Sequence, residues 1–156
     1  SALSGSAIIP LQAAGDGPPL FCLCGILIYQ ELADQLAPDV PVYGVFVPQE
    51  MEFLAFAGQS RRSAPTIRQL AAEYLKAIRE RQPRGPYRLA GFSFGGVLAY
   101  DIAQTLRQEG QDVELLAILD SDVPGRAAGG GLLAELKEQA RQLRDAGARL
   151  LAAAEP

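Results

Sequence analysis

One pentapeptide in the sequence, Gly91-Phe92-Ser93-Phe94-Gly95, has the G-x-S-x-G pattern in which two glycines flank a serine. Hydrolytic enzymes use this spacing to hold a nucleophilic serine on a sharp turn between a strand and a helix. The turn strains the backbone at the serine, and a Cβ at either glycine would crowd it. We therefore predict that Ser93 is a nucleophile, and that the backbone N–H of Phe94 faces a developing oxyanion. The alternative is a glycine-rich turn with an incidental serine.

A serine hydroxyl needs a base to take its proton, and the chain contains no histidine. It does offer an acid, because Asp120 follows the apolar run 113–119 and would share with Ser93 the carboxyl edge of a parallel sheet. In a catalytic triad such an aspartate orients a histidine and stabilises the imidazolium. A local turn hydrogen bond is the alternative role for Asp120, and Asp122 is a rival acid.

Strands and helices alternate along the sequence, as is required to position these residues. We expect strands in the apolar segments 7–15, 20–24, 40–48, 87–91 and 113–119. We expect helices from about residue 28, from residue 67, directly after Ser93, and over residues 132–154. This alternation predicts an α/β fold, a parallel sheet with helices on both faces. The nearly continuous apolar run 113–119 predicts a strand that is buried on both faces.

The helix from residue 67 has the clearest start signal. Thr66 and Gln69 have the spacing of a capping box, and apolar residues then follow a helical stripe as far as Ile78. The segment 49–65 has mixed character and suggests a loop or a short helix. Its Met51, Phe53 and Phe56 are candidates either to line an acyl channel or to pack in the core.

The composition indicates one globular domain, since 49% of the residues are hydrophobic and 21% are charged. A net charge of −4 speaks against nucleic-acid binding. No apolar run has membrane-spanning length and no signal-peptide pattern is present, so we expect no membrane partner and a cytoplasmic location. Cys22 and Cys24, two apart in an expected strand, should point to the same face as small buried hydrophobes. We expect no metal site, because histidine is absent and further ligands are lacking.

Residues 85–125 resemble the core of the thioesterase domains that end polyketide synthases and nonribosomal peptide synthetases. Residues 18–47 resemble the first strands and helix of that family, and the likeness thins after Gly129. These domains have the α/β-hydrolase fold. The resemblance implies that Ser93 accepts the acyl chain and that Asp120 is the triad acid.

The resemblance also implies an oxyanion hole made by the backbone N–H of Phe94 and a second one near Gly25 or Ile26. The substrate would be an acyl, polyketide or peptidyl chain held as a thioester on the phosphopantetheine of an acyl or peptidyl carrier protein, with no further cofactor. Water, or an internal hydroxyl or amine, would release the chain from the acyl-serine. Four arginines at 79, 81, 84 and 88 are candidates to meet the carrier or the pantetheine phosphate, or simply form a solvated helix end.

The family's histidine lies far downstream, in a loop beyond two further strands. We therefore expect residues 1–156 to be the N-terminal part of one thioesterase domain, without its C-terminal strands and histidine loop. Residues 1–126 would form the sheet core and residues 129–156 the start of the lid region. This chain alone would be inactive and, with an open strand edge at 113–119 and an exposed leucine stripe in its last helix, prone to self-association.

Three alternatives remain at this point. The domain is degenerate, or it is a non-catalytic module that binds a carrier or an acyl chain, or it is a fragment of an esterase or lipase. The last is disfavoured because the turn after the strand 20–24 lacks the HGGG signature of lipases.

Overall fold

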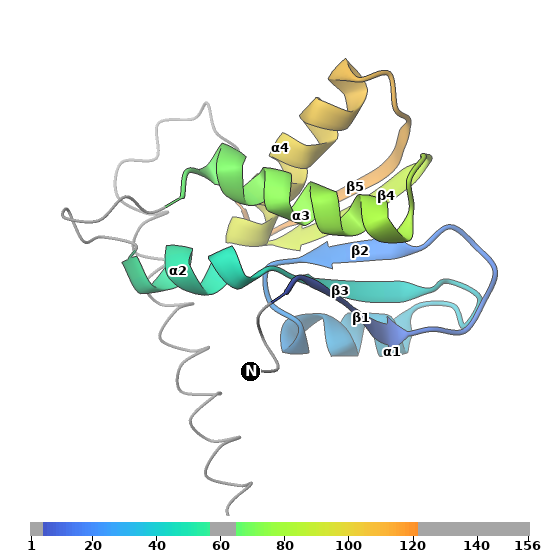
Figure 1. The fold of residues 1–156 in the computed structure, drawn as a ribbon. Coiled ribbons are helices and arrows are strands. Elements are labelled where there is room, and N and C mark those ends of the chain that lie inside the picture. Colours follow the sequence, from blue (N-terminus) through green and yellow to red (C-terminus); the bar gives the residue numbers. More distant parts are fainter. Residues whose placement is uncertain (1–4, 57–64, 122–156) are drawn as a thin grey trace, which may run out of the picture.

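The computed structural model describes residues 5–56 and 65–121, which form a five-stranded sheet of order β1-β3-β2-β4-β5 (Figure 1). The strands are β1 (Ala7–Gln12), β2 (Leu20–Leu23), β3 (Val42–Phe46), β4 (Tyr87–Phe92) and β5 (Val113–Leu119). Four of them are parallel, as predicted, whereas β1 runs antiparallel to β3. The expectation of an all-parallel sheet is wrong for β1 because only the short segment 13–19 joins it to β2. Consecutive strands that run parallel within one sheet need a longer crossover.

Helices cover both faces of this sheet, as the sequence predicts. They are the 3₁₀ turn η1 (Leu27–Tyr29) and the helices α1 (Gln30–Gln35), α2 (Pro48–Phe56), α3 (Ile67–Arg81) and α4 (Phe94–Gln108). Figure 1 shows α1 on one face and α3 with α4 on the other. Within the described ranges, no helix is long and apolar enough to cross a membrane.

Two apolar cores lie on the two faces of the sheet. The larger one joins β-strand residues such as Phe21 and Leu89 to buried residues of α3 and α4, such as Leu70 and Leu98. The smaller one gathers residues of β2, β3 and β4 around Ala33 of α1. Each strand contributes alternate side chains to each face, so the central strands are buried on both sides.

β5 departs from the prediction of a strand buried on both faces. It is the outer strand of the described sheet, and only its first residue, Val113, is buried. Leu115 is 44% exposed and Leu119 is 43% exposed, whereas Leu116 packs against the larger core under α4. The physical reason is that α1, the described helix on that face, lies against β1 at the far side of the sheet. The predicted open edge at residues 113–119 is present among the described residues, and self-association stays a prediction.

The start of α3 is set by local chemistry, as predicted. The Thr66 hydroxyl accepts a hydrogen bond from the Gln69 backbone N–H at 3.1 Å, and the Gln69 side chain accepts one from the Thr66 N–H at 2.8 Å. Two otherwise free N–H groups are satisfied in this way. The buried stripe of α3 then runs from Leu70 to Ile78.

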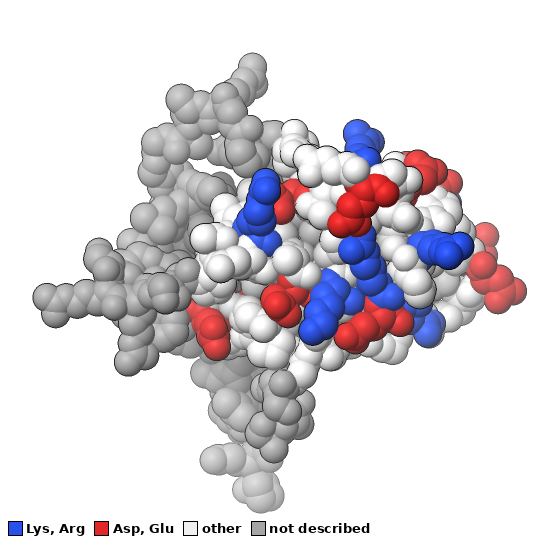
Figure 2. All heavy atoms as spheres, turned by 45° about the horizontal axis from the view of Figure 1, so that its top comes forward, with Lys and Arg blue, Asp and Glu red and all other residues white. Residues whose placement is uncertain are grey.

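Charges of both signs are interspersed on the outer face of the molecule shown in Figure 2, without a region of one sign. The figure thus shows no basic patch of the kind that binds nucleic acid. Several predictions fall outside the described residues, namely the helix 132–154, the lid region 129–156, the end of the sheet core at 122–126, and the rival acid Asp122.

Candidate active site

Ser93 occupies the turn between β4 and α4 and has φ 52° and ψ −118°, a left-handed conformation that side chains other than glycine rarely adopt. A Cβ on Gly91 would lie 2.0 Å from the Gly95 carbonyl oxygen, and one on Gly95 would lie 2.2 Å from the Leu23 carbonyl oxygen. Both glycines are therefore required by backbone crowding. The predicted strained turn at Ser93 is confirmed.

The Ser93 turn is tied directly to the end of β5. The Ser93 backbone N–H donates to the Leu119 carbonyl at 2.7 Å, and Asp120 follows Leu119. Asp120 is exposed and also left-handed, with φ 48°. The structure thus brings Ser93 and Asp120 together at the carboxyl edge of the sheet, where the sequence placed them.

A second turn reaches the same edge at the end of β2. Leu23 pairs with Gly91, two residues before the candidate nucleophile. Cys24 and Gly25 follow with φ values of 60° and 96°, and Ile26 begins the 3₁₀ turn. The Ile26 side chain packs over β3 at Gly44, where an added Cβ would lie 3.2 Å from its Cγ1. The backbone amides of this turn therefore lie at the end of the strand next to the one that carries Ser93.

Phe94 is the first residue of α4, where helical N–H groups have no partner within the helix. Its buried ring stacks on Phe53 of α2, with ring centroids 4.7 Å apart. This contact places Phe53 in core packing, one of the two roles that the sequence left open. Met51 on the same helix is 58% exposed.

Tyr29 joins the two turns, and sequence reasoning did not single it out. Its buried hydroxyl donates to the Leu23 carbonyl at 2.5 Å and accepts from the Phe92 N–H at 2.8 Å. Burial raises the pKa of Tyr29, so the hydroxyl keeps its proton and can make both hydrogen bonds. In the sequence, Tyr29 appears only as one more apolar residue at the start of a helical pattern.

Glu50, in the first turn of α2, is a buried carboxylate that the sequence analysis also missed. The Tyr74 hydroxyl of α3 donates to it, and the Cys24 thiol lies 3.8 Å from its Oε1. Burial raises the pKa of Glu50, while hydrogen bonds from Tyr74, Cys24 and the Gly25 amide act in the opposite direction. An acid in a first helical turn is common, so no signal in the sequence marked this one as buried.

The two cysteines are buried and free, as predicted, but they do not share a face. Cys22 belongs to the smaller core beside α1, whereas Cys24 belongs to the larger core beneath α3 and α4. The two-residue alternation fails because β2 ends at Leu23 and Cys24 is left-handed, which turns its side chain to the other side. Burial raises the pKa of Cys22 to about 12, so its thiol is inert.

An apolar hollow adjoins the candidate site. It is lined by Leu27, Ile28, Tyr29, Glu31, Leu32, Phe92 and Leu119. Phe92 immediately precedes Ser93, Leu119 precedes Asp120, and Leu27 follows Ile26. Each of the three predicted turns therefore contributes a neighbour to one apolar surface.

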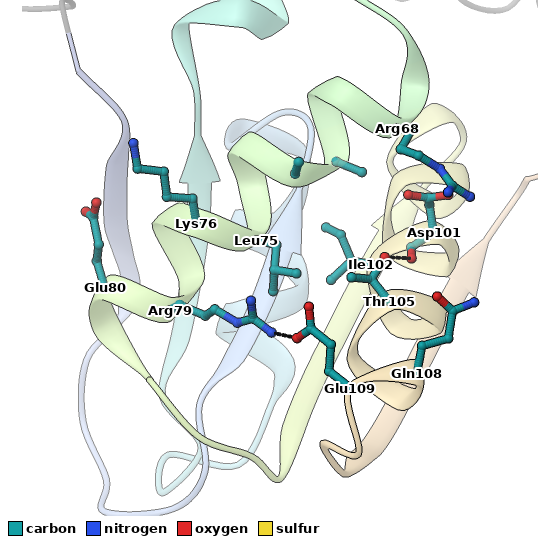
Figure 3. Close-up of a pocket in the computed structure, with 12 residues that line it drawn as sticks. Arg68, Leu75, Lys76, Arg79, Glu80, Asp101, Ile102, Thr105, Gln108 and Glu109 are labelled. Carbon is teal, nitrogen blue, oxygen red and sulfur yellow. Dashed lines mark hydrogen bonds and ion pairs between the residues drawn. The ribbon is translucent and has the colours of Figure 1, made fainter.

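A second, larger hollow lies between α3 and α4 (Figure 3) and includes neither Ser93 nor Asp120. Charged side chains line it, and Arg79 is paired there with Glu109. Arg88 pairs with Glu114, and Arg81 donates to the Tyr43 hydroxyl at 2.7 Å. These contacts lie at the C-terminal ends of α3 and α4 and at the starts of β3, β4 and β5, away from Ser93. They favour the interpretation of the arginines as a helix end rather than a phosphate site.

A strained serine on a strand-to-helix turn of a mostly parallel, helix-covered sheet defines a protein of the α/β-hydrolase type. The family described as "Thioesterase domain" matches residues 18–155. The chain belongs to this thioesterase domain family, whose homologous regions occur in nonribosomal peptide synthetases and polyketide synthases.

The relatives show how much of a larger protein this chain represents. Malpibaldin synthetase from Mortierella alpina is 39% identical over 120 residues, which are 74% of this chain and 2% of that protein. A dimodular nonribosomal peptide synthase from Bacillus subtilis is 37% identical over 118 residues, which are 73% of this chain and 5% of that protein. The thioesterase domain of NocB, from the nocardicin cluster, has a TM-score of 0.58 at 27% identity, and covers 92% of this chain and 68% of its own. The chain thus spans a small part of its curated relatives.

Proposed function

We propose that this thioesterase domain releases an acyl, polyketide or peptidyl chain from the phosphopantetheine thioester of a carrier protein, through an acyl-serine at Ser93. The observation that carries the proposal is the strained Ser93 turn, whose backbone N–H is bonded to the last carbonyl of β5, next to Asp120. Backbone strain of this kind is concentrated at functional sites, and on a strand-to-helix turn it presents the serine hydroxyl at the edge of the sheet.

In the proposed reaction the Ser93 oxygen attacks the thioester carbonyl carbon, and the carbonyl oxygen becomes an oxyanion. The backbone N–H groups of Phe94 and Ile26 stabilise that charge. The carbon–sulfur bond then breaks, and the pantetheine thiol leaves with the proton that Ser93 gave up. Water, or a hydroxyl or amine of the chain itself, finally attacks the acyl-serine and regenerates the serine. No cofactor is consumed.

The apolar hollow beside Ser93 supports an acyl substrate. Phe92 and Leu119 are 36% and 43% exposed on either side of the serine turn, and Leu27 is 63% exposed on the neighbouring turn. An exposed apolar surface that adjoins a nucleophile is the usual setting for a hydrocarbon chain. We propose that the first part of the acyl chain lies here.

The proposed base is not among these 156 residues. Asp120 orients a base in such sites rather than acting as one. The lysine of the described ranges, Lys76, lines the hollow between α3 and α4 rather than the serine turn. We propose that a histidine outside this sequence completes the triad and that the 156-residue chain alone turns over negligibly.

The test is hydrolysis of a hexanoyl thioester of N-acetylcysteamine and of a hexanoyl carrier protein. The rate is measured from the thiol that is released. Three proteins are compared: the natural protein that contains this sequence, its Ser93→Ala variant, and the 156-residue chain. We expect Ser93→Ala to lower kcat by at least about 10⁴-fold, and the short chain to show no Ser93-dependent turnover. The exposed Ser6, which directly precedes β1, three strands away from β4 in the sheet, supplies the control Ser6→Ala.

Two results would contradict the proposal. Turnover by the natural protein that persists in Ser93→Ala would exclude the acyl-serine. Carrier binding without turnover in the natural protein would instead support a non-catalytic binding module.

A further inference from the structure

The second turn of the site rests on a buried carboxylate that the proposed reaction does not use. Glu50 is 5% exposed, the same fraction as Ser93. It lies in the first turn of α2, and its backbone N–H bonds to the Val47 carbonyl at 3.0 Å. The backbone of Glu50 is therefore fixed at the start of the helix that follows β3.

The groups around Glu50 come from two further segments. Tyr74, which is fully buried on α3, donates its hydroxyl to Oε2. The Cys24 thiol lies 3.8 Å from Oε1. The Gly25 backbone amide, as a hydrogen-bond donor, lowers the pKa of the carboxyl group. One carboxylate thus connects α2 and α3 to the two left-handed residues of the turn after β2.

Stability alone is a poor explanation for this carboxylate. A buried charge loses its hydration, and an apolar side chain of similar volume is often neutral or stabilising in its place. The turn that it contacts needs support, however, since Cys24 carries a Cβ at φ 60°. Residues in such conformations persist where surrounding contacts determine them.

We propose that Glu50 is a positioning residue whose carboxylate, anchored by Tyr74, fixes the Cys24–Gly25 turn so that the Ile26 amide faces the oxyanion formed at Ser93. Glu50 touches neither the substrate nor the reacting atoms and acts only through this backbone. The inference rests on the proposed function, because it assigns the turn to the oxyanion hole.

The experiment compares Glu50→Gln with the matched control Glu52→Gln in the natural protein. Glu52 lies on the same helix and is exposed. The substrate is the hexanoyl thioester of N-acetylcysteamine. The values of kcat and KM are measured separately, at a temperature well below the thermal unfolding midpoint of each variant. Loss of one oxyanion-hole donor costs about 10²–10³-fold in kcat, so misplacing one through Glu50→Gln should cost roughly tenfold or more. KM should stay within about twofold, and Glu52→Gln should match the wild type.

A second readout separates positioning from general destabilisation. Phenylboronic acid forms a tetrahedral adduct that carries an oxyanion-like oxygen. Its affinity should fall in Glu50→Gln by about the same factor as kcat, while a merely structural role would lower the unfolding midpoint and leave this affinity unchanged. If Glu50→Gln does not fold, Tyr74→Phe decides, because it keeps the carboxylate and removes its anchor. The same kcat loss at constant KM is expected there.

The outcomes distinguish the two proposals. Turnover that depends on Ser93 but is unchanged in folded Glu50→Gln, or unchanged in Tyr74→Phe, overturns the role of Glu50 alone. Equal effects of Glu50→Gln and Glu52→Gln overturn it as well. Turnover that survives Ser93→Ala contradicts the proposed function itself.

Discussion

The two edges of the sheet differ in which residues adopt a left-handed backbone conformation. At the carboxyl edge, where β2, β4 and β5 end, the left-handed residues include Cys24, Ser93 and Asp120, all of which carry side chains. At the amino edge, the left-handed positions are the glycines Gly15 and Gly110, for which this conformation costs little. Within the described ranges, non-glycine strain is therefore confined to one edge.

Strained backbone at side-chain-bearing residues thus coincides with the edge that holds the candidate site. Each left-handed residue with a side chain costs about 1–3 kcal/mol and persists only when its surroundings determine it. The amino edge needs only turns, which glycine makes without strain, and it adds ion pairs such as Arg88 with Glu114. In the proposed function the carboxyl edge needs a hydroxyl at Ser93 and a carboxylate at Asp120, so glycine could not serve at either position.

The largest expected effect comes from adding a methyl group to one glycine at each edge. Gly95→Ala places a Cβ against the Leu23 carbonyl, and it should lower the free energy of unfolding by about 3 kcal/mol or more. Gly110→Ala meets nothing within 4 Å, and its φ of 74° should cost only about 1–2 kcal/mol. Urea unfolding of the natural protein measures both. Equal losses would mean that the carboxyl edge is not the more tightly determined of the two.

The next largest effect is a difference in stability and kcat between variants that lack one of two tyrosine hydroxyls. Tyr29→Phe leaves the Leu23 carbonyl and the Phe92 N–H without their partner and should cost about 2–3 kcal/mol. It should also lower kcat, because both groups adjoin the turns of the site. Tyr87→Phe removes a single hydrogen bond, to the Gln82 carbonyl near the amino edge, and should cost about 1 kcal/mol with kcat unchanged. A drop in kcat for Tyr87→Phe as large as that for Tyr29→Phe would remove the distinction.

A smaller effect measures the strain at Ser93 itself. Ser93→Gly and Ser93→Ala both remove the hydroxyl and should both be inactive. Only glycine relaxes at φ 52°, so Ser93→Gly should be more stable than Ser93→Ala by about 1 kcal/mol. Paired denaturant titrations test this ordering. A less stable glycine variant would show that Ser93 is not strained.

The smallest effect is a difference in pH dependence. Burial raises the pKa of Glu50 above its ordinary value of 4.5, so folding favours its protonated form. Its contribution to stability is therefore full below that value and is lost as pH rises through the folded pKa. Cys24 and Tyr74, which face Glu50, have pKa values raised well above their ordinary values and do not titrate in this range. The free energy of unfolding of the wild type should therefore fall as pH rises above about 4.5. In Glu50→Gln this part of the pH dependence should be absent.

The matched acid near the amino edge should behave in the opposite sense. Arg88 lowers the pKa of Glu114, so the contribution of Glu114 is present above its ordinary value and is lost as pH falls. Unfolding free energies of Glu50→Gln, Glu114→Gln and the wild type between about pH 3 and 7 would show the two signs, because the contribution of Glu114 changes only below its ordinary pKa of 4.5. Slopes of the same sign for both variants would contradict the assignment.

Features that depend on near neighbours along the chain could be predicted from the sequence. The glycines at 91 and 95 predicted a strained serine turn, because their spacing around a serine is a local pattern. The crowding at Gly91 is also local, since it comes from the Gly95 backbone, whereas the crowding at Gly95 comes from the Leu23 carbonyl of the neighbouring strand. The bounds of β5 at Val113–Leu119 and the capping box of Thr66 with Gln69 were likewise predictable, since an apolar run and a three-residue spacing are local patterns. Asp120 could be placed beside Ser93 because parallel strands end at one edge.

The remaining features of the fold and of the candidate site depend on contacts between segments that are distant in the sequence. The antiparallel pairing of β1, the side to which Cys24 turns, and the exposed face of β5 depend on which distant segments pack together. Glu50 is the clearest case, because its partner Tyr74 is 24 residues away and an acid in a first helical turn is ordinarily solvated. Burial and hydrogen bonding across such separations have no signature in local spacing. The contacts that support the candidate site therefore became visible only in the folded structure, whereas the candidate nucleophile could be predicted from five residues.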